Sequence, residues 1–346
     1  MAEIFSLFRL RGRVGVGVVA TLLVAAPAFA NDSTAELGTG GLDFVRNENV
    51  EMRSEQLSIS TAEIRVTYHF FNKSERPVTN LVAFPMPDIT IADEDANISV
   101  PTEDPANFLA FTTQANGQPV DIQVEQKAFA KGLDRTAMLQ EMKIPLAPHL
   151  RTTYAALDAL PRDEWRQLID LGLAEIAEYA TGPDYKMHQH LEPRWTLKTT
   201  YYWQQTFPAQ QELVIEHRYK PSVGGSAGTT LSKPDDPDAR AEEKKYCMEQ
   251  GVIDRAREMV EAARKAKNSS VGERRIDYVL KTGANWAGPI ADFMLTLDKG
   301  APDNLMSFCG KNGLKKLSPT QFQLHYTDFT PTRDLAILIL TPKIMP

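Results

Sequence analysis

Apolar and polar residues alternate along much of the chain, which is the pattern of β-strands with one buried face. The clearest case is residues 64–70, where an arginine, a threonine and a histidine separate the apolar positions. The polar run at residues 72–77 predicts a turn, and residues 78–84 predict the returning strand of a hairpin. Pro85 then ends the strand, because proline cannot donate a hydrogen bond to a sheet.

Further strands are predicted along the chain. Residues 108–113 and 120–124 predict a second hairpin, because they flank the turn dipeptide Asn116-Gly117. Residues 195–203 predict a long strand and residues 213–219 its return. The C-terminal part adds predicted strands at residues 276–280, 290–297, 321–326 and 335–340.

Three segments carry apolar residues at helical spacing instead. Residues 134–142 predict a short helix that Asp134 caps. A longer helix is predicted to begin at Pro161, with acidic residues in its first turn, and its apolar stripe runs as far as Ile176. The third predicted helix covers residues 252–263.

Hairpin blocks that alternate with helical segments predict a mainly β fold with helical insertions (α+β) and immunoglobulin-like β-sandwich elements. The predicted parts are an N-terminal β-sandwich part at residues 31–130, a helical insertion at 131–193 and a C-terminal strand-rich part at 194–346 with one long helix. Alternatively, residues 31–346 form a single unit.

Residues 1–30 have the pattern of a signal peptide. Spaced arginines precede the uncharged run 14–26, which is shorter than the roughly 20 residues that cross a bilayer. The small residues Ala28 and Ala30 predict cleavage after Ala30, so that the mature chain begins at Asn31. We therefore expect a periplasmic or secreted protein. The alternative is an uncleaved N-terminal anchor.

The chain is acidic. Without the leader's three arginines and one glutamate, the formal charge falls from −7 to −9. This argues against nucleic acid and anionic membranes as partners, because both select basic surfaces. After the leader, no run is long and apolar enough to predict a membrane span.

The chain contains two cysteines, Cys247 and Cys309. In an oxidising compartment an even pair predicts one disulfide. The alternatives are two separate buried thiols, or Cys309 as a nucleophile.

Several segments resemble an uncharacterised bacterial family, domain-of-unknown-function family 4424. The segments that carry the resemblance are residues 31–37, 40–42, 64–66, 70–74, 82–88 (VAFPMPD), 195–200, 217–224 and 283–290 (GANWAGPI). The resemblance covers nearly the whole mature chain. It implies export and an immunoglobulin-like β-sandwich element, and it supplies no activity or catalytic residues. One hairpin, within residues 64–87, is also similar to the N-terminal domain of vault and inter-alpha-trypsin-inhibitor proteins, an interaction or structural module.

The most ligand-like cluster is His188, His190 and Glu192. On a strand, residues two apart face the same side, so these three could bind zinc or copper. The alternative is a solvated linker. Two weaker patterns are a Gly-Ser segment at 224–228, which lacks the helix of a nucleophile elbow, and an acidic segment at 93–104, which lacks the glycine of a calcium loop.

Aromatic residues gather on the predicted strand that begins at residue 195. Trp195, Tyr202 and Trp203 are candidates for binding a glycan or a protein, because exposed aromatic rings grip such partners. The alternative, which we favour, is core packing.

We expect a non-catalytic binding or structural module of the cell envelope, without a cofactor, whose partner is an envelope protein or glycan. The alternative is an envelope hydrolase or metalloenzyme that uses His188, His190 and Glu192.

Overall fold

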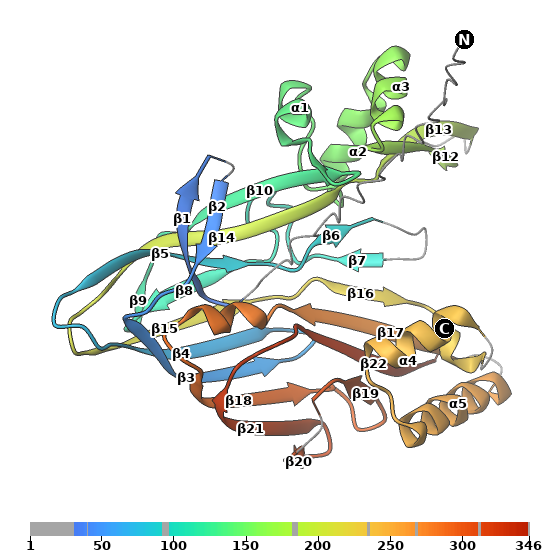
Figure 1. Ribbon diagram of the computed structural model, residues 1–346. Helices are drawn as coiled ribbons and strands as arrows, with labels where there is room; N and C mark the ends of the chain where they lie inside the picture. The colour runs from blue at the N-terminus through green and yellow to red at the C-terminus, as the bar shows by residue number, and fades with distance from the viewer. Residues whose placement is uncertain are drawn as a thin grey trace, which may run out of the picture.

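The computed structural model describes residues 31–39, 41–91, 97–181, 186–233, 236–266, 269–310 and 313–344 (Figure 1). The predicted leader, residues 1–30, lies outside the described residues. So do residues 93–96, the first four residues of the acidic segment at 93–104.

Two large sheets contain most of the strands in the described part of the chain. The first sheet contains, in spatial order, β11 (Leu133–Asp134), β10 (Gln123–Ala130), β14 (Thr196–Phe207), β5 (Val78–Pro85), β1 (Ser33–Gly38) and β2 (Gly41–Val45), and β6 (Ile89–Thr90) pairs with β14. The second contains β20 (Lys315–Lys316), β21 (Gln321–Phe329), β18 (Ile290–Asp298), β3 (Val50–Ile59), β4 (Ile64–Asn72), β15 (Glu212–Tyr219), β8 (Thr112–Ala115) and β9 (Gln118–Pro119). Its β18 and β3 run parallel.

Two smaller sheets complete the β-structure. One contains β19 (Leu305–Phe308), β22 (Leu335–Ile344), β17 (Ser269–Tyr278), β16 (Val223–Ser226) and β7 (Asn97–Ser99), and the other is the hairpin of β12 (Ala174–Thr181) and β13 (Lys186–Pro193). The helical segments are α1 (Thr136–Glu141), α2 (Arg151–Asp158), α3 (Arg162–Asp170), α4 (Pro237–Lys245) and α5 (Gln250–Lys265), with short 3-10 helices η1 (Thr230–Ser232) and η2 (Lys281–Asn285).

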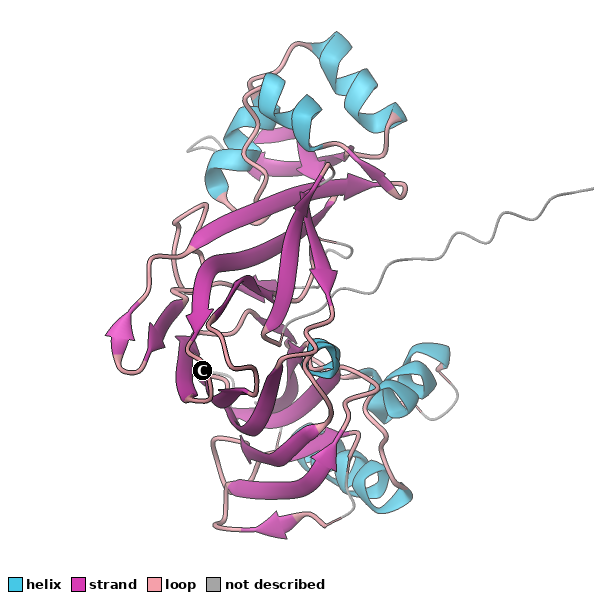
Figure 2. Ribbon diagram, turned by 60° about the vertical axis from the view of Figure 1, so that its left-hand side comes forward, coloured by secondary structure: helices cyan, strands magenta, loops and turns pink. Residues whose placement is uncertain are grey.

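The helices gather at two ends of the strand-rich body. Figures 1 and 2 show α1, α2 and α3 at one end and α4 and α5 at the other. Within the described ranges, no helix combines the length and apolar character that crossing a lipid bilayer requires. The predicted mainly β fold with helical insertions is confirmed.

The main core contains buried residues of the first two sheets and of the five-stranded sheet that includes β17 and β22. Its buried apolar cluster includes Val50 near the start of the described chain and Ile339 near its end. Aromatic rings join the two sheets, because the Trp203 ring of β14 and the His217 ring of β15 lie 5.3 Å apart between centroids. The main core therefore contains residues from both ends of the described chain.

Two predicted hairpins are wrong. Strand β4 pairs with β3 and β15, whereas β5 pairs with β14 and β1, so the turn between β4 and β5 carries the chain from one sheet to the other. The Asn72 side chain holds this corner, since its Nδ2 donates to the Arg76 carbonyl (2.8 Å) and the Phe207 carbonyl (3.0 Å). Strands β14 and β15 likewise lie in different sheets.

The predicted helix from Pro161 to Ile176 is too long. Helix α3 ends at Asp170, and Gly172 follows with a φ of +72°, a backbone conformation that glycine adopts without strain. The Leu173 amide then bonds the Leu168 carbonyl (2.8 Å), which closes the last turn. Ile176 therefore falls on β12, where 48% of it is exposed.

Candidate functional site

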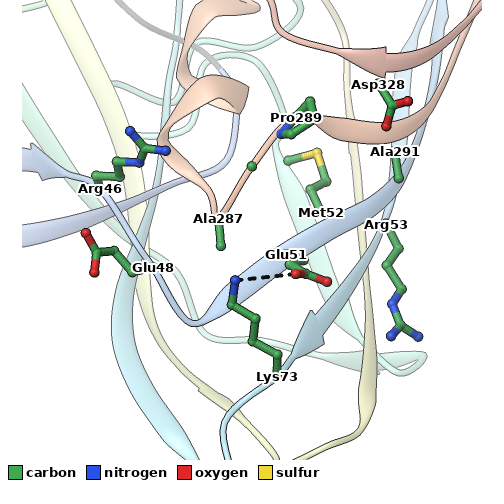
Figure 3. Close-up of a pocket in the computed structure, with 11 residues that line it drawn as sticks. Arg46, Glu48, Glu51, Met52, Arg53, Lys73, Ala287, Pro289, Ala291 and Asp328 are labelled. Atoms are coloured by element: carbon green, nitrogen blue, oxygen red, sulfur yellow. Dashed lines mark ion pairs between the residues drawn. The ribbon is translucent and has the colours of Figure 1, made fainter.

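A cavity of about 510 Å³ opens beside the start of β3 (Figure 3). We call it the β3 pocket. Its polar lining residues are Arg46, Glu48, Glu51, Arg53, Lys73 and Asp328, and its other lining residues are Met52, Ala287, Gly288, Pro289 and Ala291. These residues come from the β2–β3 loop, β3, the end of β4, the η2–β18 loop, β18 and β21, so folding alone brings them together.

A β-bulge aims one cation at the pocket. The pairing of β3 with β4 shifts register between Met52 and Ser54, so Arg53 is the extra residue of the bulge. Bulges re-aim side chains in this way near binding sites. The Arg53 guanidinium carbon lies 3.5 Å from the centroid of the Phe71 ring, which holds an exposed cation in one place.

The loop before β3 is fixed by a buried asparagine. The Asn47 Oδ1 accepts hydrogen bonds from the Asn49 amide (2.8 Å) and the Val50 amide (3.0 Å), and the Asn47 amide donates to the Asn285 carbonyl (2.7 Å). The flanking residues Arg46 and Glu48 are therefore exposed at set positions on the pocket wall.

Charges of both signs stand at each side of the pocket. Figure 3 shows Arg46 and Glu48 at one side and Arg53 and Asp328 at the other. Between them, the Lys73 Nζ and the Glu51 Oε1 form an ion pair (3.4 Å). Within the described residues no ion pair engages the charges at the two sides, so they are available to a ligand that carries both signs.

The predicted metal residues lie together on β13, as their spacing requires. The His188 and His190 rings are 6.5 Å apart between centroids. The His190 Nδ1 lies 2.7 Å from the Asp158 Oδ2 of α2, and Glu192 lies 3.9 Å from the Arg194 guanidinium. Over the described part of the chain, no group of three or more His, Cys, Asp or Glu side chains is arranged to hold a metal ion.

The aromatic candidates are mostly inside the protein. Trp195 is fully buried and its Nε1 donates to the Leu146 carbonyl (2.7 Å), while Trp203 is 2% exposed. Tyr202 is partly buried and packs against a small cluster that contains Ala35. The two tryptophans therefore present no surface to a ligand in this conformation, and they contribute to the core.

Cys247 and Cys309 form a disulfide, with 5.0 Å between their α-carbons. The bond joins the end of α4 to the segment after β19.

The residues of the β3 pocket are not among the candidates predicted from the sequence. One signal was present, because the buried positions of β3 change phase between Met52 and Leu57. Such a change from even to odd positions marks a bulge, and a bulge at Arg53 marks a re-aimed side chain.

The model of the family described as Domain of unknown function (DUF4424) matches residues 30–338. No curated protein sequence matches the chain.

Two solved structures show distant likeness. A Legionella pneumophila protein provisionally assigned as a nutrient-binding protein is 14% identical with a TM-score of 0.42, over 90% of this chain and 70% of that one. An M1 zinc metallopeptidase from Deinococcus radiodurans is 8% identical with a TM-score of 0.22, over 85% of this chain and 43% of that one. Both TM-scores are too low to carry a functional argument.

Proposed function

The chain belongs to the family described as Domain of unknown function (DUF4424), and from the β3 pocket we propose that it is a non-catalytic binding module of the bacterial cell envelope. The pocket holds a segment of an envelope protein or glycan that carries charges of both signs. The observation that carries the proposal is the arrangement of Arg46, Glu48, Arg53 and Asp328 at opposite sides of one cavity.

The shape of the pocket supports binding rather than catalysis. The Arg53 guanidinium rests on the Phe71 ring, and a cation held in advance loses little conformational freedom when a ligand arrives. No histidine, cysteine or serine is among the described residues that line the pocket, and two of its catalysis-capable side chains, Glu51 and Lys73, are paired with each other.

Two observations support placing the protein in the periplasm or outside the cell. The leader pattern of residues 1–30 predicts export with cleavage after Ala30. The disulfide between Cys247 and Cys309 is typical of an oxidising compartment.

Reversing two charges of the pocket tests the binding role. The processed chain is immobilised, envelope extract is passed over it, and the retained components are quantified by mass spectrometry. We expect the double variant Arg46→Glu, Arg53→Glu to retain at least about tenfold less of the partner than the unchanged chain.

The control for this experiment changes the same number of charges elsewhere. Arg255 and Arg264 of α5 have side chains that are 75% and 77% exposed, and neither is among the residues that line the pocket. Arg255→Glu, Arg264→Glu should retain the partner as well as the unchanged chain. Equal retention by the pocket variant would remove the β3 pocket from the proposal.

The metalloenzyme alternative makes a different prediction. Since the described residues bring no third ligand to His188 and His190, we expect less than stoichiometric zinc in protein purified without chelator. Elemental analysis measures the zinc. One zinc per chain that disappears in the variant His188→Ala, His190→Ala would restore that alternative.

A further inference from the structure

The first residues after the predicted cleavage point are polar and buried. Asn31, Asp32 and Ser33 are fully buried and Thr34 is 2% exposed. Chain termini usually lie at the surface and are poorly ordered. Buried polar groups cost free energy unless they are hydrogen-bonded, so this segment needs specific partners.

Asn31 has those partners. Its backbone nitrogen donates to the Thr282 Oγ1 (2.6 Å), and that hydroxyl donates back to the Asn31 carbonyl (2.6 Å). Its Nδ2 donates to the Glu55 Oε2 (3.0 Å), and its Oδ1 accepts from the Tyr68 hydroxyl. Gly283 leaves room for the Asn31 side chain, because a β-carbon at position 283 would lie only 2.6 Å from the Asn31 Nδ2.

Asp32 extends the buried cluster. Its Oδ1 lies 2.9 Å from the His217 Nε2, and both side chains are fully buried. Its carbonyl accepts from the Trp286 Nε1 (2.7 Å). Residues 31 and 32 therefore tie together β3, β4, β15 and the η2 region.

The cluster is short of positive charge and of hydrogen-bond donors. It contains two buried carboxyl groups, Asp32 and Glu55, and one imidazole, His217. The Asp32 Oδ2 and the Glu55 Oε1 are buried and have no hydrogen-bond partner among the described residues. Burial raises the pKa of Glu55 to about 8; the hydrogen bond from Asn31 opposes this shift and the Asp32 charge adds to it.

We propose that this cluster is a binding site for the α-ammonium group that leader cleavage creates at Asn31, with Thr282 as hydrogen-bond acceptor and Glu55 as the counter-charge. Hydrolysis of the Ala30–Asn31 peptide bond consumes one water and leaves a carboxylate on Ala30 and an amine on Asn31, which takes up a proton. The single amide N–H of the precursor thereby becomes three N–H donors and a positive charge.

The consequence is that processing completes the fold. Beside the neutral amide of the precursor, burial favours the uncharged form of Glu55, whereas the α-ammonium of the processed chain supplies a positive charge that favours the Glu55 carboxylate and pairs with it. This inference rests on the predicted cleavage site and not on the β3 pocket, so failure of the ligand-capture experiment leaves it intact.

Amine labelling tests whether the α-amino group is bound. The exported, processed chain is treated with an acetylating N-hydroxysuccinimide ester, and the N-terminal peptide is followed by mass spectrometry. A comparison variant carries Gly-Ser between Ala30 and Asn31, which moves the new amine two residues away. We expect the Asn31 amine of the native chain to react at least about tenfold more slowly than the amine of this variant, and equally fast in urea.

Two outcomes of the labelling would overturn the inference. One is that, without urea, the N-terminal amines of the unchanged chain and of the Gly-Ser variant react equally fast. The other is a mature N-terminus at a residue other than Asn31, which the same spectra report and which would also withdraw the predicted cleavage site.

A second variant tests the counter-charge. Glu55→Gln keeps an oxygen that accepts from the Asn31 Nδ2 but removes the negative charge. We expect it to lower the Tm of the processed chain by about 5 °C and to leave the Tm of the Gly-Ser variant unchanged or higher. Equal losses of Tm in both chains would show that Glu55 does not pair with the α-ammonium.

Discussion

The variant Asp32→Ala should lose about 3–5 kcal/mol of the free energy of unfolding, because it leaves the buried His217 without its partner. The Asp32 and His217 side chains are both fully buried, and the His217 Nδ1 has no hydrogen-bond partner among the described residues. Aromatic rings surround the imidazole, with the Phe84 and Trp203 centroids at 4.9 and 5.3 Å. Urea titration followed by circular dichroism measures the loss.

The chain supplies a matched control for this variant. The His325 Nε2 and the Asp292 Oδ2 lie 2.8 Å apart, but their side chains are 51% and 46% exposed. Asp292→Ala removes the same kind of pair where water can replace it, so we expect a loss below about 1 kcal/mol. If both variants lose less than about 1 kcal/mol of the free energy of unfolding, the prediction is wrong. The buried Asp32–His217 pair then contributes no more than the exposed pair does.

Local patterns predicted the strands well and their partners poorly. Strand β4 has the burial pattern that alternation predicts, and the Asn116-Gly117 turn has the positive φ angles of a tight hairpin, 48° and 76°. Partner choice depends on which sheet a strand enters, and the corner at Asn72 is held by the carbonyl of Phe207, which is distant in the sequence. A pattern of period two cannot contain that contact.

The candidate sites follow the same division. The spacing of His188 and His190 placed both on one strand, but a metal site needs further ligands from other elements, which only the tertiary fold supplies. The β3 pocket and the Asn31 cluster combine residues from four or more elements each. The sequence of β3 contains a local sign of both sites, because its buried positions change from even to odd numbers after Met52. This change marks the bulge that directs Arg53 outward and Glu55 inward.

Removing the disulfide should have an effect of similar size to that of Asp32→Ala. Cys247 and Cys309 are 62 residues apart, and closing a loop of that length removes unfolded-chain entropy worth about 4 kcal/mol at room temperature. The loop contains α5, β17 and β18, so its constraint acts on much of the C-terminal part. We expect Cys247→Ser, Cys309→Ser to lose about that amount of the free energy of unfolding in urea titrations.

The control for the double serine variant is the unchanged chain with its disulfide reduced. With a thiol reductant present, its unfolding midpoint should fall to that of the double serine variant, and the variant's midpoint should not move. A midpoint of the unchanged chain that ignores the reductant, together with a loss below about 1 kcal/mol in the variant, would contradict the prediction. A chain with reduced thiols should lack the same amount of stability, so the measured loss equals the stability that an oxidising compartment would add.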